Sequence, residues 1–362
     1  MPKHIAVEPS YNRCELVLSD LHHRITGVSA SIRALLPQLD ERYELMFLAN
    51  RSQGRVLARS LWTGFREMAR PPFMRPYRIW HVRRNNEMIW GLIARDILRL
   101  PVKLVFTSAA IRQHSWYPRQ LIARMDAVIA TSDRAAGFLT RVAAVVPHGV
   151  DIDRFELSAL PAGPVRDQPW TGYSVCLGIV GRVRPEKGTD IFVDALCASL
   201  PKYPQACAIV AGKVTSSYSA FARSLKDRLA QAGILDRVFF LDEVDADEMP
   251  RLYSQLDIVC APARYEGFGL VPIEAMVSGT AIIGSRTGAY EAMIDDTQTG
   301  FLVDVGSVTQ ITDAVRSLLS SRELLDRMKQ AGRQKVRDQF SLGAEVAGIA
   351  RVYEAVWKGN GN

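Results

Sequence analysis

The sequence predicts an α/β fold built from two doubly wound domains. Its 362 residues exceed the size at which one hydrophobic core usually stops growing, which favours two domains. Short apolar runs alternate with helical patterns along most of the chain, and this alternation predicts parallel sheets with helices on both faces. A composition of 48% hydrophobic and 23% charged residues is that of a globular enzyme and excludes a disordered or fibrous protein.

Six apolar runs carry the strand prediction, at residues 103–107, 127–131, 175–180, 207–211, 238–241 and 258–261. We place the domain boundary near residue 150, which gives domains at 1–150 and 151–341. Pro and Gly are concentrated over residues 160–172, as in a connection between domains. The spacing of apolar residues predicts a last helix over about 342–358, and we expect it to pack back on the first domain.

Charge is divided unequally between the two halves. Residues 1–150 contain 22 Lys and Arg against 11 Asp and Glu, and residues 151–362 contain 23 against 27. The halves therefore carry +11 and −4, so the first is expected to face a polyanion: a lipid headgroup, a nucleic acid or an anionic acceptor.

Cysteine usage and hydropathy indicate the compartment. Five widely spaced cysteines without a Cys-x-x-Cys pair argue against a zinc site or a disulfide framework. No apolar run approaches the roughly 18 residues of a membrane span, and the first residues lack the apolar stretch of a signal peptide. We therefore expect a cytoplasmic protein.

A basic loop that contains glycine follows the strand predicted at 175–180. It runs from Gly181 to Gly188 and contains Arg182 and Lys187. Glycines permit close backbone approach, and a loop that opens a helix places cations beside helix N–H groups, an arrangement that binds phosphate. Arg182 offers a planar fork to diphosphate oxygens and Lys187 a point charge. Taken alone, the loop is equally consistent with a solvated basic turn.

A second loop follows the strand at 258–261 and carries two carboxylates. Glu266 lies among glycines, whereas Glu274 lies on the first turn of a helix that Pro272 begins and Gly279 ends. Ligands of doubly wound domains bind at this edge of the sheet, where carboxylates accept hydrogen bonds from ribose or hexose hydroxyls. A helix-dipole role is the alternative for Glu274. Four backbone N–H groups are candidates for phosphate: those of Gly267, Phe268, Gly269 and Leu270.

Together, the two loops resemble the double signature of the family 4 retaining glycosyltransferases. Further matches at 148–151, 284–291 and 299–303 extend the likeness over most of the chain. The resemblance implies the GT-B fold, two Rossmann-like doubly wound domains facing a cleft. It makes 1–150 the acceptor-side domain and 151–341 the donor-binding domain. Segments 24–31, 81–88 and 106–115 resemble the lipopolysaccharide core mannosyltransferases of bacteria.

The same resemblance assigns roles to the residues of both loops. It implies that Arg182 and Lys187 neutralise the nucleotide diphosphate as it leaves. Glu266 would contact the transferred hexose, and Glu274 would hold the ribose of the nucleoside.

Three residues nearer the N-terminus are also assigned from the resemblance. The loop at Gly27 resembles the family's glycine loop that meets the donor phosphates, but it has one glycine where relatives often have two, so a plain helix start is the alternative. His148 and Asp151 are interpreted as hinge-supporting residues that also touch the donor.

The acceptor side departs from the family pattern. Many relatives place a histidine just after the strand that corresponds to 103–106, where this chain has Thr107 and Ser108. His81 and His114 are candidates to take over that role. An ordinary polar or capping function is the alternative for both.

The resulting hypothesis is a retaining hexosyltransferase that needs neither a metal nor a cofactor. The resemblance implies transfer of mannose from GDP-mannose to a lipid-linked or lipopolysaccharide-core acceptor, at the inner face of the cytoplasmic membrane. A UDP-hexose donor and a non-catalytic donor-binding or lipid-binding assembly protein are the alternatives. A nicotinamide or flavin oxidoreductase is disfavoured because Gly-x-Gly-x-x-Gly is absent, and Asp245 and Asp247 precede a helix as capping residues would.

An arginine-rich segment suggests how the protein reaches such an acceptor. Between Arg55 and Arg84, eight arginines face one acid, Glu67, and are interleaved with aromatic residues. Arginine mixed with aromatic residues is typical of a segment at a membrane interface, so we expect an anionic membrane surface as partner and no nucleic acid. A solvated basic face or a nucleic-acid patch is the alternative.

Overall fold

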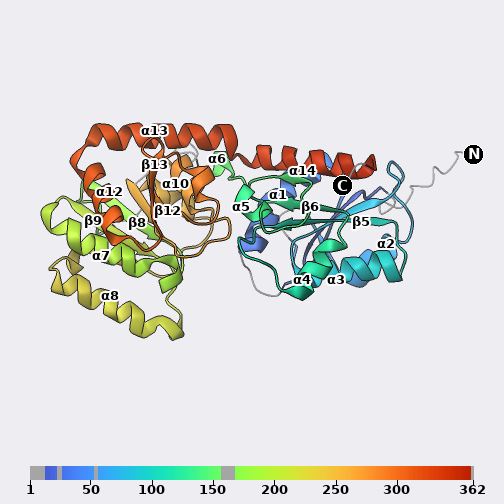
Figure 1. Cartoon of the computed structure of the whole chain (residues 1–362), viewed down its shortest axis with the longest axis horizontal. Coiled ribbons are helices and arrows are strands. Elements are labelled where there is room, and N and C mark those ends of the chain that lie inside the picture. Colours follow the sequence, from blue (N-terminus) through green and yellow to red (C-terminus); the bar gives the residue numbers. More distant parts are fainter. Residues whose placement is uncertain (1–12, 23–26, 53–55, 156–167, 360–362) are drawn as a thin grey trace, which may run out of the picture. The chain divides into compact units, whose positions relative to one another are not determined.

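A computed structural model describes residues 13–22, 27–52, 56–155 and 168–359. The chain forms two compact units, Met1–His148 with Leu342–Asn362, and Gly149–Ser341. Each unit is a parallel sheet with helices on both of its faces (Figure 1). The predicted α/β class with two Rossmann-like domains is confirmed. Most of the connection predicted at 160–172 lies outside the described residues.

The first unit contains a seven-stranded sheet in the order β3-β2-β1-β4-β5-β6-β7. Its strands are β1 Leu16–Asp20, β2 Leu45–Ala49, β3 Ala58–Arg59, β4 Arg78–Val82, β5 Val102–Ser108, β6 Ala127–Ala130 and β7 Ala144–Val145. Its helices are α1 Gly27–Arg42, α2 Leu61–Glu67, α3 Asn85–Leu92, α4 Trp116–Ala123, α5 Asp133–Ala136 and α14 Leu342–Trp357, with a π-helical turn at Ile93–Ile97. Successive residues of β1 point into two different cores, Leu16 into one and Val17 into the other, so both faces of the sheet are covered.

The last helix, α14, belongs to the core of this first unit although it follows the second unit in sequence. Tyr353 and Trp357 pack against Tyr43 at the end of α1, with ring centroids 5.8 and 5.7 Å from the Tyr43 ring. Trp357 also donates a hydrogen bond of 3.0 Å to the Tyr77 carbonyl. The aromatic end of α14 therefore closes one face of the first sheet.

The second unit contains a six-stranded sheet in the order β10-β9-β8-β11-β12-β13. Its strands are β8 Val175–Val180, β9 Ala206–Ala211, β10 Val238–Leu241, β11 Ile258–Ala261, β12 Ala281–Ser285 and β13 Gly300–Val303. Its helices are α6 Ile152–Phe155, α7 Thr189–Ser199, α8 Ser219–Gln231, α9 Met249–Ser254, α10 Val271–Val277, α11 Tyr290–Met293, α12 Val308–Ser320 and α13 Arg322–Gln339. Short 3-10 turns lie at Pro185–Lys187, Leu200–Lys202, Ser216–Tyr218 and Leu235–Arg237.

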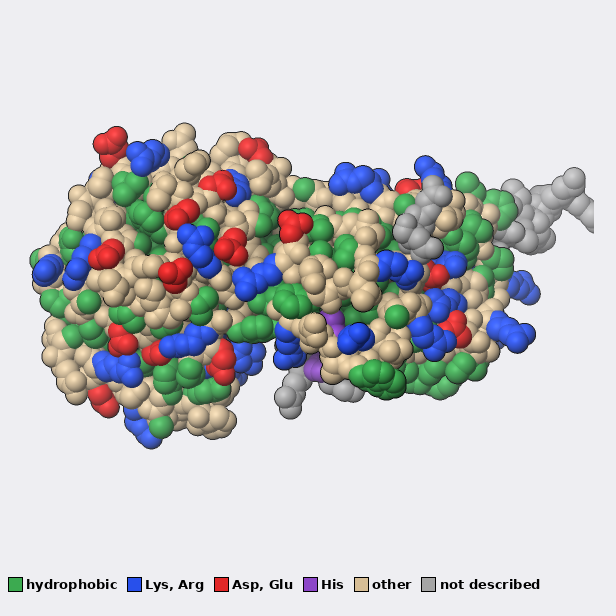
Figure 2. Space-filling view, in the orientation of Figure 1, with side chains coloured by type: hydrophobic (Ala, Val, Ile, Leu, Met, Phe, Trp, Pro, Cys, Tyr) green, Lys and Arg blue, Asp and Glu red, His purple; other side chains and the backbone are tan. Residues whose placement is uncertain are grey.

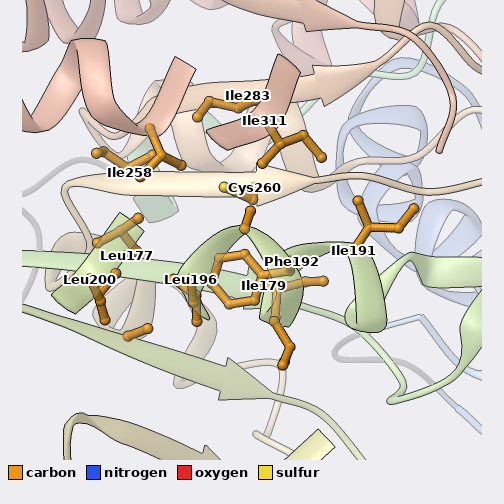
Figure 3. Close-up of a cluster of buried hydrophobic side chains, with 14 of the residues drawn as sticks. Leu177, Ile179, Ile191, Phe192, Leu196, Leu200, Ile258, Cys260, Ile283 and Ile311 are labelled. Atoms are coloured by element: carbon orange, nitrogen blue, oxygen red, sulfur yellow. The ribbon is translucent and has the colours of Figure 1, made fainter. Parts of the chain in front are cut away.

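The core of the second unit fixes the strands that carry the two predicted loops. Ile179 from β8 and Cys260 from β11 lie against Phe192 and Leu196 of α7 (Figure 3). Burial of the sheet explains why these strands read as continuous apolar runs and why Cys260 is a packing residue.

The strand order reverses direction between β8 and β11. From β8 the chain proceeds to β9 and β10 on one side, whereas β11, β12 and β13 extend the sheet on the other. Such a switch point opens a crevice at the carboxyl ends of its two central strands. The loops after β8 and β11 are the two that the sequence singled out.

Candidate functional site

The loop after β8 is held against the loop after β11 by close backbone packing. Gly188 has φ of 72°, and a Cβ atom at that position would lie 2.0 Å from the carbonyl oxygen of Pro262. Only glycine fits this approach, which brings the start of α7 next to the end of β11. Lys187 ends the 3-10 turn Pro185–Lys187 just before this contact.

The two loops also meet through charge, because Lys187 forms an ion pair with Glu266. Both side chains are partly buried, with 23% and 18% of their surface exposed. The second carboxylate oxygen of Glu266 accepts a hydrogen bond of 3.2 Å from the Gly267 N–H. The structure thus brings together two of the predicted catalytic residues and fixes the carboxylate at both oxygens.

Arg182, the third predicted catalytic residue, has an exposed side chain. Within the described part of the chain, its guanidinium makes no ion pair and no hydrogen bond. It follows Gly181, the first residue after β8, whose N–H donates to the Ala211 carbonyl at 2.9 Å. Arg182 therefore extends from a fixed backbone and has its donors free for an anion.

The glycine-containing loop after Glu266 rests on a buried tyrosine. Gly269 has φ of 79°, and a Cβ atom there would lie 2.6 Å from the Tyr290 ring. Phe268 is buried, whereas Gly267, Gly269 and Leu270 are partly exposed. The loop therefore packs through Phe268 and keeps part of its backbone accessible.

Glu274 lies on the first turn of α10, as the sequence predicted. Its carboxylate accepts a hydrogen bond of 2.9 Å from the hydroxyl of Tyr253. Burial raises the pKa of Glu274, while the Tyr253 hydroxyl and the charge of Arg154 act in the opposite direction. The pKa of Tyr253 is raised well above its ordinary value by burial and by Glu274, so this tyrosine keeps its proton and donates a hydrogen bond to the carboxylate.

In the first unit, Gly27 is the first residue of α1, and residues 24–26 of its loop lie outside the described residues. Two residues further, the Ser29 hydroxyl donates to Asp20 at the end of β1 at 3.2 Å. Arg84 binds the same carboxylate at 2.5 Å and also donates to Ser29 at 2.8 Å. The start of α1 is thereby tied to the carboxyl edge of the sheet.

The two acceptor-side histidine candidates occupy different environments. His81 is buried in β4, with one ring nitrogen 2.6 Å from the Tyr353 hydroxyl and the other 2.7 Å from the Thr107 hydroxyl. Burial, together with the charge of Arg83, keeps the pKa of His81 well below its ordinary value. The ring of His81 therefore stays neutral, and both of its nitrogens are engaged.

His114 is only partly buried and lies in the loop between β5 and α4, where its Nε2 is 3.4 Å from the hydroxyl of Ser108 at the end of β5. Burial and the nearby charge of Arg112 lower its pKa. A neutral imidazole at the carboxyl edge of the first sheet can accept a proton.

His148 and Asp151 flank the point where the chain passes from the first unit into the second. His148 Nδ1 is 2.8 Å from Glu345 of α14, which also lies 3.7 Å from Arg83. Asp151 is exposed and accepts a hydrogen bond of 3.3 Å from the backbone N–H of Arg154. Each residue is therefore held within its own unit, His148 in the first and Asp151 in the second.

Comparison with known proteins decides the family. The family described as glycosyl transferases group 1 matches residues 171–335, which contain both loops. The lipopolysaccharide core biosynthesis mannosyltransferase LpcC of Rhizobium leguminosarum bv. viciae is 37% identical over 349 residues, covering 96% of this chain and 98% of LpcC. This chain belongs to the group 1 glycosyltransferases.

Other relatives agree with this assignment to the glycosyltransferases. The mannosyltransferase LpsB of Rhizobium meliloti, also named for lipopolysaccharide core biosynthesis, is 34% identical over 95% of this chain and 98% of LpsB. Anabaena HepE, solved in complex with UDP, superposes with a TM-score of 0.75 at 19% identity, covering 94% of this chain and 100% of HepE. The protein is therefore a glycosyltransferase enzyme of GT-B fold.

Two buried tyrosines near this glycosyltransferase's carboxylates could not be predicted from the sequence. Tyr253 and Tyr290 are buried aromatic residues far along the chain from the carboxylates they approach, and no local pattern marks them. Arg264 and Asp190 were also missed, although each stands two residues from a motif residue, Glu266 or Gly188. Their opposite charges were the only available signal.

The arginine-rich segment is divided between interior and surface. Arg78 is fully buried and donates to the carbonyls of Met68 and Arg70. Arg75 pairs with Glu15 and Glu354, and Arg83 and Arg84 pair with acids as well. Arg55 lies outside the described residues. The remaining three arginines have exposed side chains: Arg59, Arg66 and Arg70.

Proposed function

We propose that this glycosyltransferase moves a hexose, mannose from GDP-mannose, with retention of configuration onto a lipid-linked acceptor during lipopolysaccharide core assembly. The two Rhizobium relatives are mannosyltransferases of lipopolysaccharide core biosynthesis, which supports both the sugar and the process. The ion pair of Lys187 with Glu266, at the switch point of the second sheet, is the observation that best supports a catalytic function.

In this proposal the second unit binds the donor. Arg182 and Lys187 stabilise the diphosphate as its bond to the sugar breaks, because two fixed cations near a departing anion lower the barrier without a metal. Glu266 contacts the transferred hexose. Glu274 accepts hydrogen bonds from the ribose while Tyr253 holds the carboxylate in place.

Backbone groups complete the proposed donor site. Gly269 and Leu270, which are partly exposed, offer their N–H groups to phosphate oxygens in this proposal, whereas the Gly267 N–H donates to Glu266. Phe268 fixes the loop by its burial. Gly27, His148 and Asp151 are proposed to touch the donor as well.

For the acceptor side we propose His114 as the group that receives the proton of the attacking hydroxyl. Its position at the carboxyl end of β5, beside Ser108, supports this role. Because both nitrogens of His81 are engaged, we propose that it positions Thr107 and Tyr353 at the same sheet edge.

The proposed acceptor requires the enzyme to reach a membrane surface. In the part of the chain that the structure describes, no helix is long and apolar enough to cross a bilayer. Three side chains near the exposed arginines are strongly exposed for apolar residues: Trp62 at 72%, Phe73 at 72% and Met74 at 78%.

We propose that these residues, together with Arg59, Arg66 and Arg70, bind the anionic inner face of the cytoplasmic membrane. Figure 2 supports the charge asymmetry, because acidic and basic side chains alternate over the second unit whereas Lys and Arg predominate over the first.

The test is a screen of nucleotide sugars with a lipid-A-type acceptor, read by product mass. GDP-mannose should give a product heavier by one hexose. A UDP-hexose donor is the second candidate, favoured by the structural likeness to the UDP complex of HepE. Hydrolysis of the donor to nucleotide and free sugar, with no heavier acceptor, would support neither candidate. Binding of donor without turnover would make the protein an assembly partner instead.

A further inference from the structure

The hydrogen bonds between β8 and β11 do not hold together the two loops that follow these strands. β8 and β11 pair only through Leu177 with Ile258 and Gly178 with Val259. β8 and β9, by contrast, pair as far as Val180. The strands at the switch point therefore separate before their loops begin, and the relative position of Lys187 and Glu266 must be set by other contacts.

One residue, Arg264, makes most of these contacts. The guanidinium of Arg264, on the loop after β11, donates to both carboxylate oxygens of Asp190 at 2.8 and 2.7 Å. It also donates to the Pro185 carbonyl at 2.5 Å. Its own backbone N–H donates to the Glu186 carbonyl at 2.9 Å. Arg264 thus binds the 3-10 turn that contains Lys187 and the first turn of α7 that follows it.

The register of these contacts places Arg264 next to the catalytic pair. Along the loop after β11, Pro262 packs on Gly188 and Glu266 pairs with Lys187. Arg264 lies between them in sequence and binds Pro185, Glu186 and Asp190. A bidentate arginine–carboxylate pair has a fixed planar geometry, which a lysine or a single hydrogen bond does not supply. Asp190 is held in its charged form, since Arg264 lowers its pKa although burial acts in the opposite direction.

We propose that Arg264 and Asp190 form a staple that positions Lys187 and Glu266 for transfer, without touching the donor. This inference rests on the proposed function, in which Lys187 and Glu266 act on the donor. A positioning pair should matter for turnover because a misplacement of about 1 Å at the reacting centre can cost up to about a hundredfold in rate.

The experiment is a double-mutant cycle in the full-length enzyme. Asp190→Asn and Arg264→Met should each lower kcat by about tenfold or more, and the double variant should be no worse than either single one, because both remove the same pair. Asp190→Asn should lose most of its effect in a Lys187→Ala background, since the staple acts through Lys187.

The matched control is Asp194→Asn. Asp194 lies one turn further along α7 and pairs with Arg228 of α8 at 2.9 Å rather than with Arg264. This variant should keep wild-type kcat and donor KM. Thermal unfolding of all variants separates a loss of fold from a loss of positioning.

Two results would overturn the staple. The first is wild-type kcat in both single variants. The second is a lower kcat in Arg264→Met together with wild-type kcat in Asp190→Asn, which would make Arg264 a donor contact. If Lys187→Ala and Glu266→Ala are themselves fully active, the proposed donor site fails. If those two are inactive and the cycle shows no effect, only the staple fails.

Discussion

Lys187 and Glu266, 79 positions apart in sequence, form an ion pair where the strand order of the second sheet reverses. Each charge satisfies the other. In the function proposed above, a nucleotide sugar separates them, because its diphosphate competes for the ammonium and its hexose hydroxyls for the carboxylate. This pair is therefore the first target for mutation.

Lys187→Ala and Glu266→Ala are each expected to lower kcat at least about a hundredfold, the range for loss of a preorganised transition-state contact. Steady-state kinetics with unchanged circular dichroism is the measurement. Asp326→Ala serves as control, because it removes a carboxylate from an exposed ion pair on α13. More than about half of wild-type kcat in either site variant would place the chemistry elsewhere.

The transfer is expected to retain the anomeric configuration and to continue in the presence of a chelator, because two cations take the place of a metal at the leaving group. NMR of the product formed from a mannose donor should show an α linkage, with the same rate before and after EDTA. A β linkage, or activity lost to EDTA and restored by magnesium, would refute this prediction.

Glu274→Gln should weaken donor binding and raise the unfolding temperature at pH 8. Burial raises the pKa of Glu274 in the folded state, so the folded protein holds that proton more tightly than the unfolded chain does. The resulting stabilisation is complete below the ordinary pKa of glutamate and is lost as pH rises through the raised value. At pH 8 the variant, which carries no charge to bury, should unfold at a higher temperature than wild type.

This stability difference should narrow as the pH approaches 4, where the wild-type carboxyl is protonated. Donor KM should rise about tenfold from loss of a charged hydrogen-bond acceptor. Unfolding curves across pH and donor kinetics measure the two effects separately. A stability difference that grows toward low pH would show that the sign of the pKa shift is wrong.

Membrane binding is expected to depend on the exposed arginines of the first unit. Replacing Arg59, Arg66 and Arg70 by Ser should weaken partitioning onto anionic vesicles by about a hundredfold, at about 1 kcal/mol for each Arg. High salt should release the wild type because exposed charge is screened. The control variant replaces three exposed arginines of the second unit, Arg223, Arg322 and Arg327. Equal sedimentation of the two triple variants would exclude this surface.

Arg78 should behave as a core residue rather than as part of the membrane surface. Its guanidinium is fully buried on carbonyl acceptors, so Arg78→Met leaves buried acceptors unsatisfied. We expect a loss of about 3 kcal/mol, which lowers Tm by roughly 6–12 °C, without a specific effect on vesicle binding. Arg70→Met, on an exposed side chain, should leave Tm unchanged. A wild-type Tm for Arg78→Met would contradict this interior role.

Local pattern was sufficient to predict much of the second unit. The strand β11, the loop that carries Glu266 and the first turn of α10 with Glu274 all follow from an apolar run, glycines and Pro272. The burial of individual side chains could not be predicted from local pattern. Arg78 and Arg59 belong to the same basic segment, yet one is buried and the other exposed.

The sequence by itself determined the α/β class, the parallel sheets and the two glycine-containing loops, because strand periods and helix signals depend on neighbours within a few residues. Only the tertiary structure decided that Lys187 pairs with Glu266, that Arg264 binds Asp190 and that both nitrogens of His81 are engaged by Thr107 and Tyr353. These contacts join residues distant in the chain, and burial depends on which helices cover each strand. Neither is encoded in a local period, so both had to be found in the folded chain.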